Sequence, residues 1–186
     1  MEEFYDELNK LKATGDQKAV GEFLLEAVSE SGNSGDNVKR AVLLNELAGF
    51  YEDEGRFTEA ENAFRQALKA YESEGLESTP EYSAVALNYA AAVTLKAGAM
   101  FRAGSHFEAL GEFRRALDLA LGFFGENIEY AQCKISISEV YALLGELPSA
   151  ITEMSGAVRI MERILGKNDR SVKEARTRLE ELKAEG

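Results

Sequence analysis

Residues 44–71, LNELAGFYEDEGRFTEAENAFRQALKAY, contain two apolar stripes of helical period joined by a glycine-containing turn. Apolar residues that recur every three or four positions lie on one face of a helix. The stripes consist of Leu44, Leu47, Ala48 and Tyr51, then of Ala60, Phe64, Ala67, Leu68 and Tyr71. Gly55 marks the turn, and Thr58 with Glu61 predicts a capping box for the second helix. Such a pair cannot bury both of its faces alone, so the chain requires similar neighbours.

This spacing resembles the tetratricopeptide repeat pattern. The matching positions are Leu44, Leu47, Ala48, Tyr51, Gly55, Ala60, Phe64 and Ala67. The chain departs from the pattern at Leu44, where the family often has tryptophan, and at Glu72, where proline often closes the unit. The longer linker before the next pair is similar to the extended repeats of kinesin light chain and of many bacterial repeat proteins. The resemblance implies an all-α fold, a right-handed αα-superhelix (solenoid) of antiparallel helix pairs.

Applied along the chain, the pattern predicts about nine helices in a single TPR-like domain, residues 1–186. The predicted parts are a degenerate pair (1–30), a repeat (37–73), a lengthened repeat (80–121), another regular repeat (127–165) and a capping helix (168–184). Residues 31–36 and 122–127 are expected to be turn and linker segments. Asp16, either Asp36 or Asn37, and Thr79 are expected at helix N-termini, because their side-chain oxygens can accept from backbone N–H groups.

The lengthened repeat exceeds its neighbours by about seven residues, or two helical turns, so its turn falls at Gly98 or at Gly104. We favour Gly104, because the second helix then keeps a regular inward stripe. That stripe would be Phe107, Leu110, Phe113 and Leu117.

Charge and composition restrict the partners. The chain has 21 Lys and Arg against 33 Asp and Glu, a net charge of −12, which disfavours nucleic acid and anionic membranes as main partners. No apolar run approaches the ~20 residues of a membrane span. The start, MEEFYDELNKLK, is acidic and amphipathic, unlike a signal peptide. A single cysteine, Cys133, excludes an intramolecular disulfide. We therefore expect a cytoplasmic protein, and the polar last helix suggests a natural end.

Neither a catalytic nor a metal-binding pattern is present in the sequence. His106 is the single histidine and is expected at a turn or cap, and Cys133 is expected in a packed helix interface. Gly166-Lys167 is followed by Asn168, so it does not complete a phosphate-binding loop, and no other nucleotide, hydrolase or calcium motif occurs. We predict that the chain is not an enzyme and needs no cofactor or metal.

The resemblance implies that the first helices of successive pairs line a concave groove for a peptide or a partner helix. The residues carried over are Asn45, Gly49, Glu52 and Asp53; Ala84, Asn88, Ala91 and Thr94; Gln132, Ile135, Ser136 and Glu139. They lack the cations with which chaperone-binding members clamp a C-terminal carboxylate. Glu52, Asp53 and Glu139 instead favour a basic or amide-rich protein or peptide. The alternatives are a self-assembling scaffold, a homo-oligomer whose groove binds another copy, and a regulatory enzyme subunit.

Overall fold

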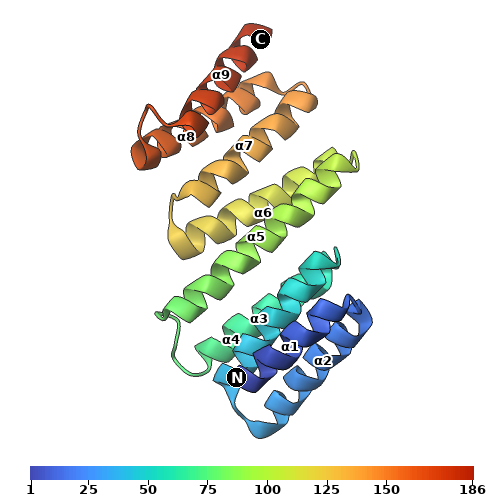
Figure 1. Ribbon diagram of the computed structural model, residues 1–186. Coiled ribbons are helices and arrows are strands. Elements are labelled where there is room, and N and C mark those ends of the chain that lie inside the picture. The colour runs from blue at the N-terminus through green and yellow to red at the C-terminus, as the bar shows by residue number, and fades with distance from the viewer. The chain divides into compact units, whose positions relative to one another are not determined.

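The computed structural model describes all 186 residues and contains nine helices and no strand (Figure 1). The helices are α1 (Glu2–Thr14), α2 (Gln17–Ser34), α3 (Asn37–Asp53), α4 (Phe57–Glu72), α5 (Pro80–Arg102), α6 (His106–Phe124), α7 (Ile128–Leu143), α8 (Leu147–Leu165) and α9 (Arg170–Glu185). The all-α prediction is confirmed. The chain forms two compact units, Met1–Tyr89 and Ala90–Gly186, where we expected one domain, and α5 contributes to both.

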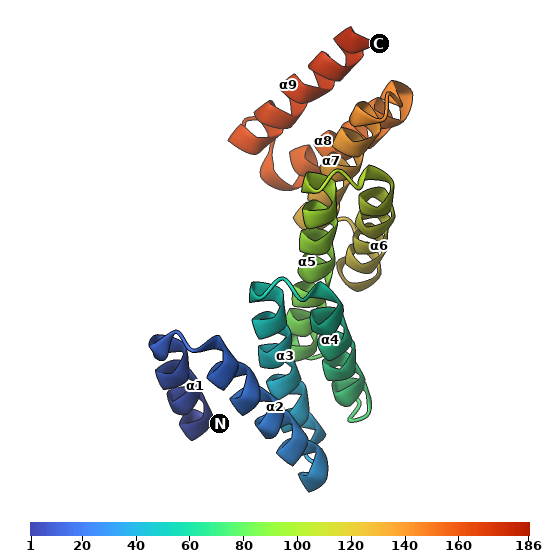
Figure 2. The same ribbon diagram turned by 90° about the vertical axis from the view of Figure 1, so that its right-hand side faces the viewer.

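In the first unit, α3 and α4 lie antiparallel and side by side (Figures 1 and 2). The two predicted stripes form their interface, and Phe64 is the largest fully buried side chain, with its ring centroid 6.3 Å from that of Tyr89. The predicted capping box is wrong. The N-cap of α4 is Arg56, with no side-chain cap, and Thr58 already lies in the first helical turn. Arg56 instead pairs with Glu59 at 2.9 Å, which moves the start of the helix toward Gly55.

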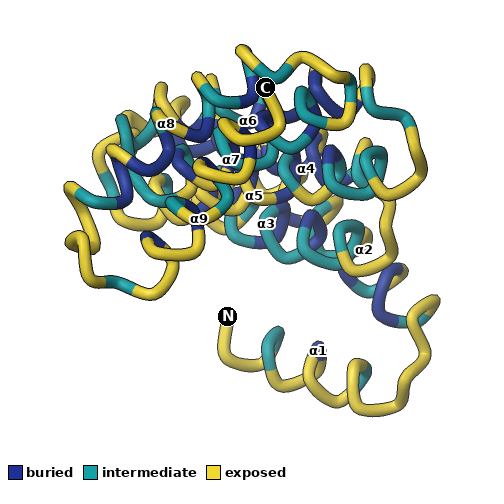
Figure 3. The backbone as a smooth tube through the Cα atoms, turned by 90° about the horizontal axis from the view of Figure 1, so that it is seen from above, coloured by how far each residue is buried: buried dark blue, intermediate teal, exposed yellow.

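The first pair, α1 and α2, is held by aromatic packing: the rings of Phe4 and Phe23 stack with centroids 5.3 Å apart. Most of the surface of α1 is exposed (Figure 3). The predicted turn at 31–36 is mostly helix, because α2 continues to Ser34 and ends at Gly35 with φ 72°. Ser31 is buried in this extended part of α2, and its hydroxyl donates to the carbonyl of Val28, so the buried polar group has a partner. Asp16, Asp36 and Thr79 accept backbone hydrogen bonds at the predicted helix starts.

In the second unit, the turn after α5 lies at Gly104, as favoured. Gly104 has φ 84°, a left-handed conformation suited to glycine, whereas Gly98 is inside α5. The expectation that Phe107 points inward is wrong, since 75% of it is exposed. His106 takes the inward place, with its ring centroid 5.3 Å from that of Phe101. Helix α6 also runs to Phe124, so the predicted linker at 122–127 is shorter than expected.

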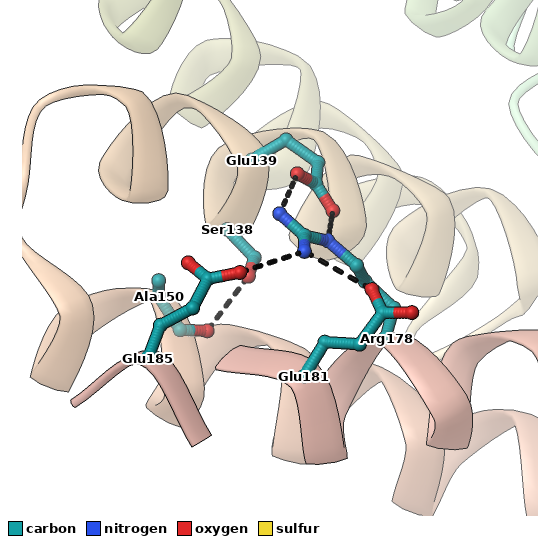
Figure 4. A network of polar contacts seen from close by, with 6 residues as sticks. All are labelled: Ser138, Glu139, Ala150, Arg178, Glu181 and Glu185. Carbon is teal, nitrogen blue, oxygen red and sulfur yellow. Dashed lines mark hydrogen bonds and ion pairs between the residues drawn. The ribbon is translucent and has the colours of Figure 1, made fainter. Parts of the chain in front are cut away.

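Helices α7, α8 and α9 form the rest of this unit. The buried hydroxyl of Ser138 on α7 donates to the carbonyl of Ala150 on α8 at 2.7 Å (Figure 4). Pro148 lies in the first turn of α8, as its fixed φ allows. Helix α9 begins at Arg170 after its N-cap Asp169, two residues beyond the predicted start at 168. It buries one apolar stripe: Val172, Ala175, Leu179 and Leu182.

Helix α5 is long and apolar enough to span a bilayer by length and composition, contrary to the expectation that no segment reaches this limit. Core helices of water-soluble proteins pass the same test. Seven of its residues are buried inside the fold: Val85, Ala86, Tyr89, Ala90, Ala92, Val93 and Ala97.

Candidate functional site

A mostly apolar pocket of about 230 Å³ lies in the second unit between α5, α6 and α7. We call it the alanine pocket, because four alanines leave the space that larger side chains would fill. Its lining is Ala90, Ala91, Thr94, Leu95, Ala116, Ala120, Glu129, Gln132 and Cys133. Three predicted groove residues from two different helices, Ala91, Thr94 and Gln132, therefore meet at one pocket.

Cys133 contributes a protonated thiol to this pocket. Its Sγ lies 3.5 Å from the hydroxyl of Thr94, and its residue is almost completely buried. Burial raises the pKa of the Cys133 thiol above its usual value of 9.0. The hydrogen bond with Thr94 opposes this effect in part, and the Glu129 carboxylate adds to it. A thiol of raised pKa is a poor nucleophile. His106, at the start of α6, does not line the pocket, so the geometry supplies no cysteine–histidine pair.

The first unit has a pocket of the same construction, two first helices with a second helix between them. It measures about 430 Å³ and is lined by residues of α1, α2 and α3: Glu3, Phe4, Glu7, Phe23, Glu26, Ala27, Glu30, Lys39 and Leu43. We call it the acidic pocket, because four carboxylates face one ammonium group. Of the four, Glu7 forms an ion pair with Lys10 on its own helix, 3.2 Å away.

The acidic pocket was missed by the sequence analysis because the first pair lacks most signature residues. A signal was nevertheless present: glutamates four residues apart, Glu3 with Glu7 and Glu26 with Glu30, share a helix face. The stacked rings of Phe4 and Phe23 place these two faces beside each other.

Two predicted groove residues of the first unit contact each other. The amide Nδ2 of Asn88 donates to Oδ1 of Asn45 at 3.1 Å, although 43 residues separate them. Gly49 faces open space, since a Cβ built there would meet no atom within 4 Å. Near the end of the same helix, Glu52 is half-buried and Asp53 is exposed. Burial, and then the charge of Asp53, raises the pKa of Glu52 above its usual value of 4.5. Ala84 is exposed on α5.

The remaining predicted residues lie along α7, outside the alanine pocket. Both carboxylate oxygens of Glu139 accept from the guanidinium of Arg178 on α9, at 2.8 and 2.9 Å (Figure 4). The negative charge of Glu139 is thus neutralised within the protein. Ile135 packs against the core of α8 and α9, and Ser136 is half-buried. No group of three or more His, Cys, Asp or Glu side chains is arranged to hold a metal ion.

Comparison with known proteins gives a family for part of the chain and a fold for all of it. The tetratricopeptide repeat family model matches residues 40–74. No curated protein matches the chain. Among solved structures, the chain is similar to BtubC (BKLC) from P. vanneervenii, at 18% identity and TM-score 0.55, covering 98% of this chain and 75% of that one.

Two further structures are similar over nearly the whole chain. A putative kinesin light chain with nearly identical TPR-like repeats, from Podosopora anserina, has 14% identity and TM-score 0.56, covering 99% of this chain and 87% of that one. The apo form of RapI has 16% identity and TM-score 0.66, covering 98% of this chain. The chain spans 47% of the length of RapI.

At these identities the structural likeness establishes the fold alone. Residues 40–74 match the tetratricopeptide repeat family model, and the chain as a whole has the TPR-like fold of paired helices.

Proposed function

We propose that this protein is a non-catalytic interaction module that binds a peptide or a helix of a partner protein. The observation that carries the proposal is the meeting of Ala91, Thr94 and Gln132 at the alanine pocket. The repeat pattern of the sequence alone predicts these three residues in the groove. Their convergence on an apolar cavity supports the use of this face for binding.

The alanine pocket favours an apolar side chain of the partner. Burying a leucine- or phenylalanine-sized side chain contributes roughly 1.5–3 kcal/mol, so one such anchor is a substantial part of a micromolar affinity. The amide of Gln132 and the carboxylate of Glu129, both exposed beside the pocket, can bond to the partner's backbone or polar groups.

The acidic pocket favours a lysine or arginine side chain. Its carboxylates outnumber its single ammonium by four to one, and the Phe4 and Phe23 rings provide aromatic surface for a cation. A partner segment bound at the acidic pocket would therefore carry a basic side chain.

The proposal can be tested by panning a display library of random 15-residue peptides on the wild-type protein and measuring the affinity of enriched peptides by calorimetry. Ala91→Phe fills the alanine pocket, and we expect it to weaken these peptides at least tenfold, which corresponds to about 1.4 kcal/mol. Ala184→Phe, the same change at an exposed position on α9, is the matched control. If the enriched peptides bind Ala91→Phe as tightly as wild type, the proposal is wrong.

Association of two copies is a second candidate, favoured by two large exposed apolar side chains in the second unit, Phe107 and Leu143, which are 75% and 62% exposed. The net charge of −12 opposes it at low salt. Light scattering between 5 and 500 µM at two salt concentrations distinguishes the candidates. A mass that stays at 20.4 kDa throughout excludes association.

A further inference from the structure

A third pocket, of about 250 Å³, lies in the first unit between α3 and α4 and has the opposite charge from the acidic pocket. Its lining is Asn37, Arg40, Gln66, Lys69, Ala70 and Ser73. Two cations and no carboxylate line it, in a protein with an excess of 12 acidic groups. We call it the Arg40 pocket.

Arg40 is the unusual member. Its side chain forms no ion pair, and its Nε is buried and donates no hydrogen bond. The guanidinium lies against the backbone of α2, because a Cβ built at Gly32 would be 3.5 Å from Nη1 and 3.7 Å from Cζ. An unpaired buried donor costs about 1–3 kcal/mol, more when it is charged. Arg40 also lines the pocket, so its guanidinium is a candidate donor for a ligand there.

The other lining groups add one charge and one free amide. Lys69 is exposed and pairs with no carboxylate, and the amide of Gln66 is exposed. Asn37 donates to the carboxylate of Glu74 at 2.7 Å, and Ser73 donates its proton to the carbonyl of Ala70. The donors that remain for a ligand are therefore the guanidinium, the ammonium and the Gln66 amide.

We propose that the Arg40 pocket binds a phosphate group, either inorganic phosphate or a phosphate monoester. A phosphate carries about −1.5 to −2 charge at pH 7 and presents several strong acceptor oxygens, which matches two cations. Arginine is suited to phosphate because its donors bind two oxygens at once. Arg40 precedes the predicted groove residue Gly49 by nine positions, which is about half a turn around the helix. The site is thus on another face and does not depend on the proposed function.

The test is a titration of the ¹⁵N-labelled protein with inorganic phosphate at pH 7.5 and constant ionic strength, followed by amide chemical shifts. We expect saturable shifts at residues 37–40 and 66–73, with a dissociation constant on the order of 1 mM. Arg40→Met and Lys69→Met should each weaken binding at least tenfold. Lys173→Met removes the same charge from an exposed position on α9 and should leave binding unchanged.

A parallel titration with O-phosphoserine identifies the source of the group. Tighter binding than inorganic phosphate indicates a phosphorylated side chain, and weaker binding indicates free phosphate. Shifts of the wild-type protein that do not saturate, or binding by both methionine variants that is as tight as binding by the wild type, overturn the proposal. Because Lys69 is exposed, Lys69→Met keeps the test valid if Arg40→Met changes the far-ultraviolet circular dichroism.

Discussion

Arg178 on α9 donates to both carboxylate oxygens of Glu139 on α7, 39 residues earlier in the chain, and so joins the last helix to α7 (Figure 4). The same guanidinium lies 3.2 Å from Glu181 and 3.4 Å from Glu185. These hydrogen bonds, led by that to Glu139, raise the pKa of Arg178 above its usual value. Helix α9 is therefore held by α7 as well as by its apolar contacts with α8.

Replacing Arg178 by methionine should destabilise the protein by roughly 1 kcal/mol. A bidentate pair is stronger than an ordinary surface ion pair, but solvent screens this one because both side chains are about a third exposed. Arg170→Met, which removes a highly exposed pair with Glu174 on the same helix, should change stability by less than about 0.5 kcal/mol. Urea denaturation measures both values. Equal effects of the two substitutions would show that the Glu139 pair contributes nothing specific.

The two candidate turn glycines should respond to alanine in opposite directions. Gly104→Ala places a side chain at φ 84° and should cost about 1 kcal/mol or more. Gly98→Ala lies in a helix, where alanine is better by roughly 0.5–1 kcal/mol, and the new Cβ would be 3.4 Å from the flexible end of Arg102. In thermal denaturation followed by circular dichroism, the melting temperature should be highest for Gly98→Ala, intermediate for the wild type and lowest for Gly104→Ala. The reverse order would place the turn at Gly98.

Helix period was sufficient to predict which faces are buried. Leu44, Leu47, Ala48 and Phe64 are all buried because one stripe of each helix must be covered by its neighbour. The helix period did not predict that Phe107 is exposed, because the end of a helix has fewer neighbours and His106 occupies the place against Phe101. The predicted cap of α4 was also wrong. Arg56 is the N-cap residue and pairs with Glu59, and the Thr58–Glu61 motif is not used as a cap.

Glu52 should make stability depend on pH. Because its pKa is raised in the folded state, the folded protein binds more protons than the unfolded chain between the two pKa values. Stability therefore falls as pH rises through that interval, and the ionised Glu52 lowers stability above it. Glu52→Gln should be more stable than wild type at pH 7, and the difference should shrink as pH falls toward 4.5. A difference that is constant from pH 7 to pH 4 would contradict this assignment.

Cys133 should react slowly with an aromatic disulfide reagent such as DTNB. Burial keeps its thiol protonated, so at pH 8 the folded protein should react roughly 100-fold more slowly than the urea-unfolded chain, and the rate should still be rising above pH 9. Ala91→Phe should slow the reaction further because both residues line the alanine pocket, whereas Ala184→Phe should not. A fast reaction of the folded protein would show that the thiol is accessible and ionised.

The candidate site was only partly predictable. The repeat register identified Ala91, Thr94 and Gln132, because side chains of first helices face the same way in every repeat. It did not identify Ala116 and Ala120, which complete the same pocket from α6, because that depends on how closely three helices approach. It identified Glu139 as a groove carboxylate, but the pairing with Arg178 comes from a helix outside the regular repeats.

Helix α5 has a practical consequence for dissecting the protein. The border between the two units falls between Tyr89 and Ala90, inside one continuous helix. A cut there leaves helical pieces spanning 80–89 and 90–102, near or below the ~12–15 residues at which an isolated helix becomes marginal in water. Neither fragment would end at a natural helix terminus. Chimeras of related proteins are therefore better joined at the glycine turns, Gly75 or Gly104, than at the border between the units.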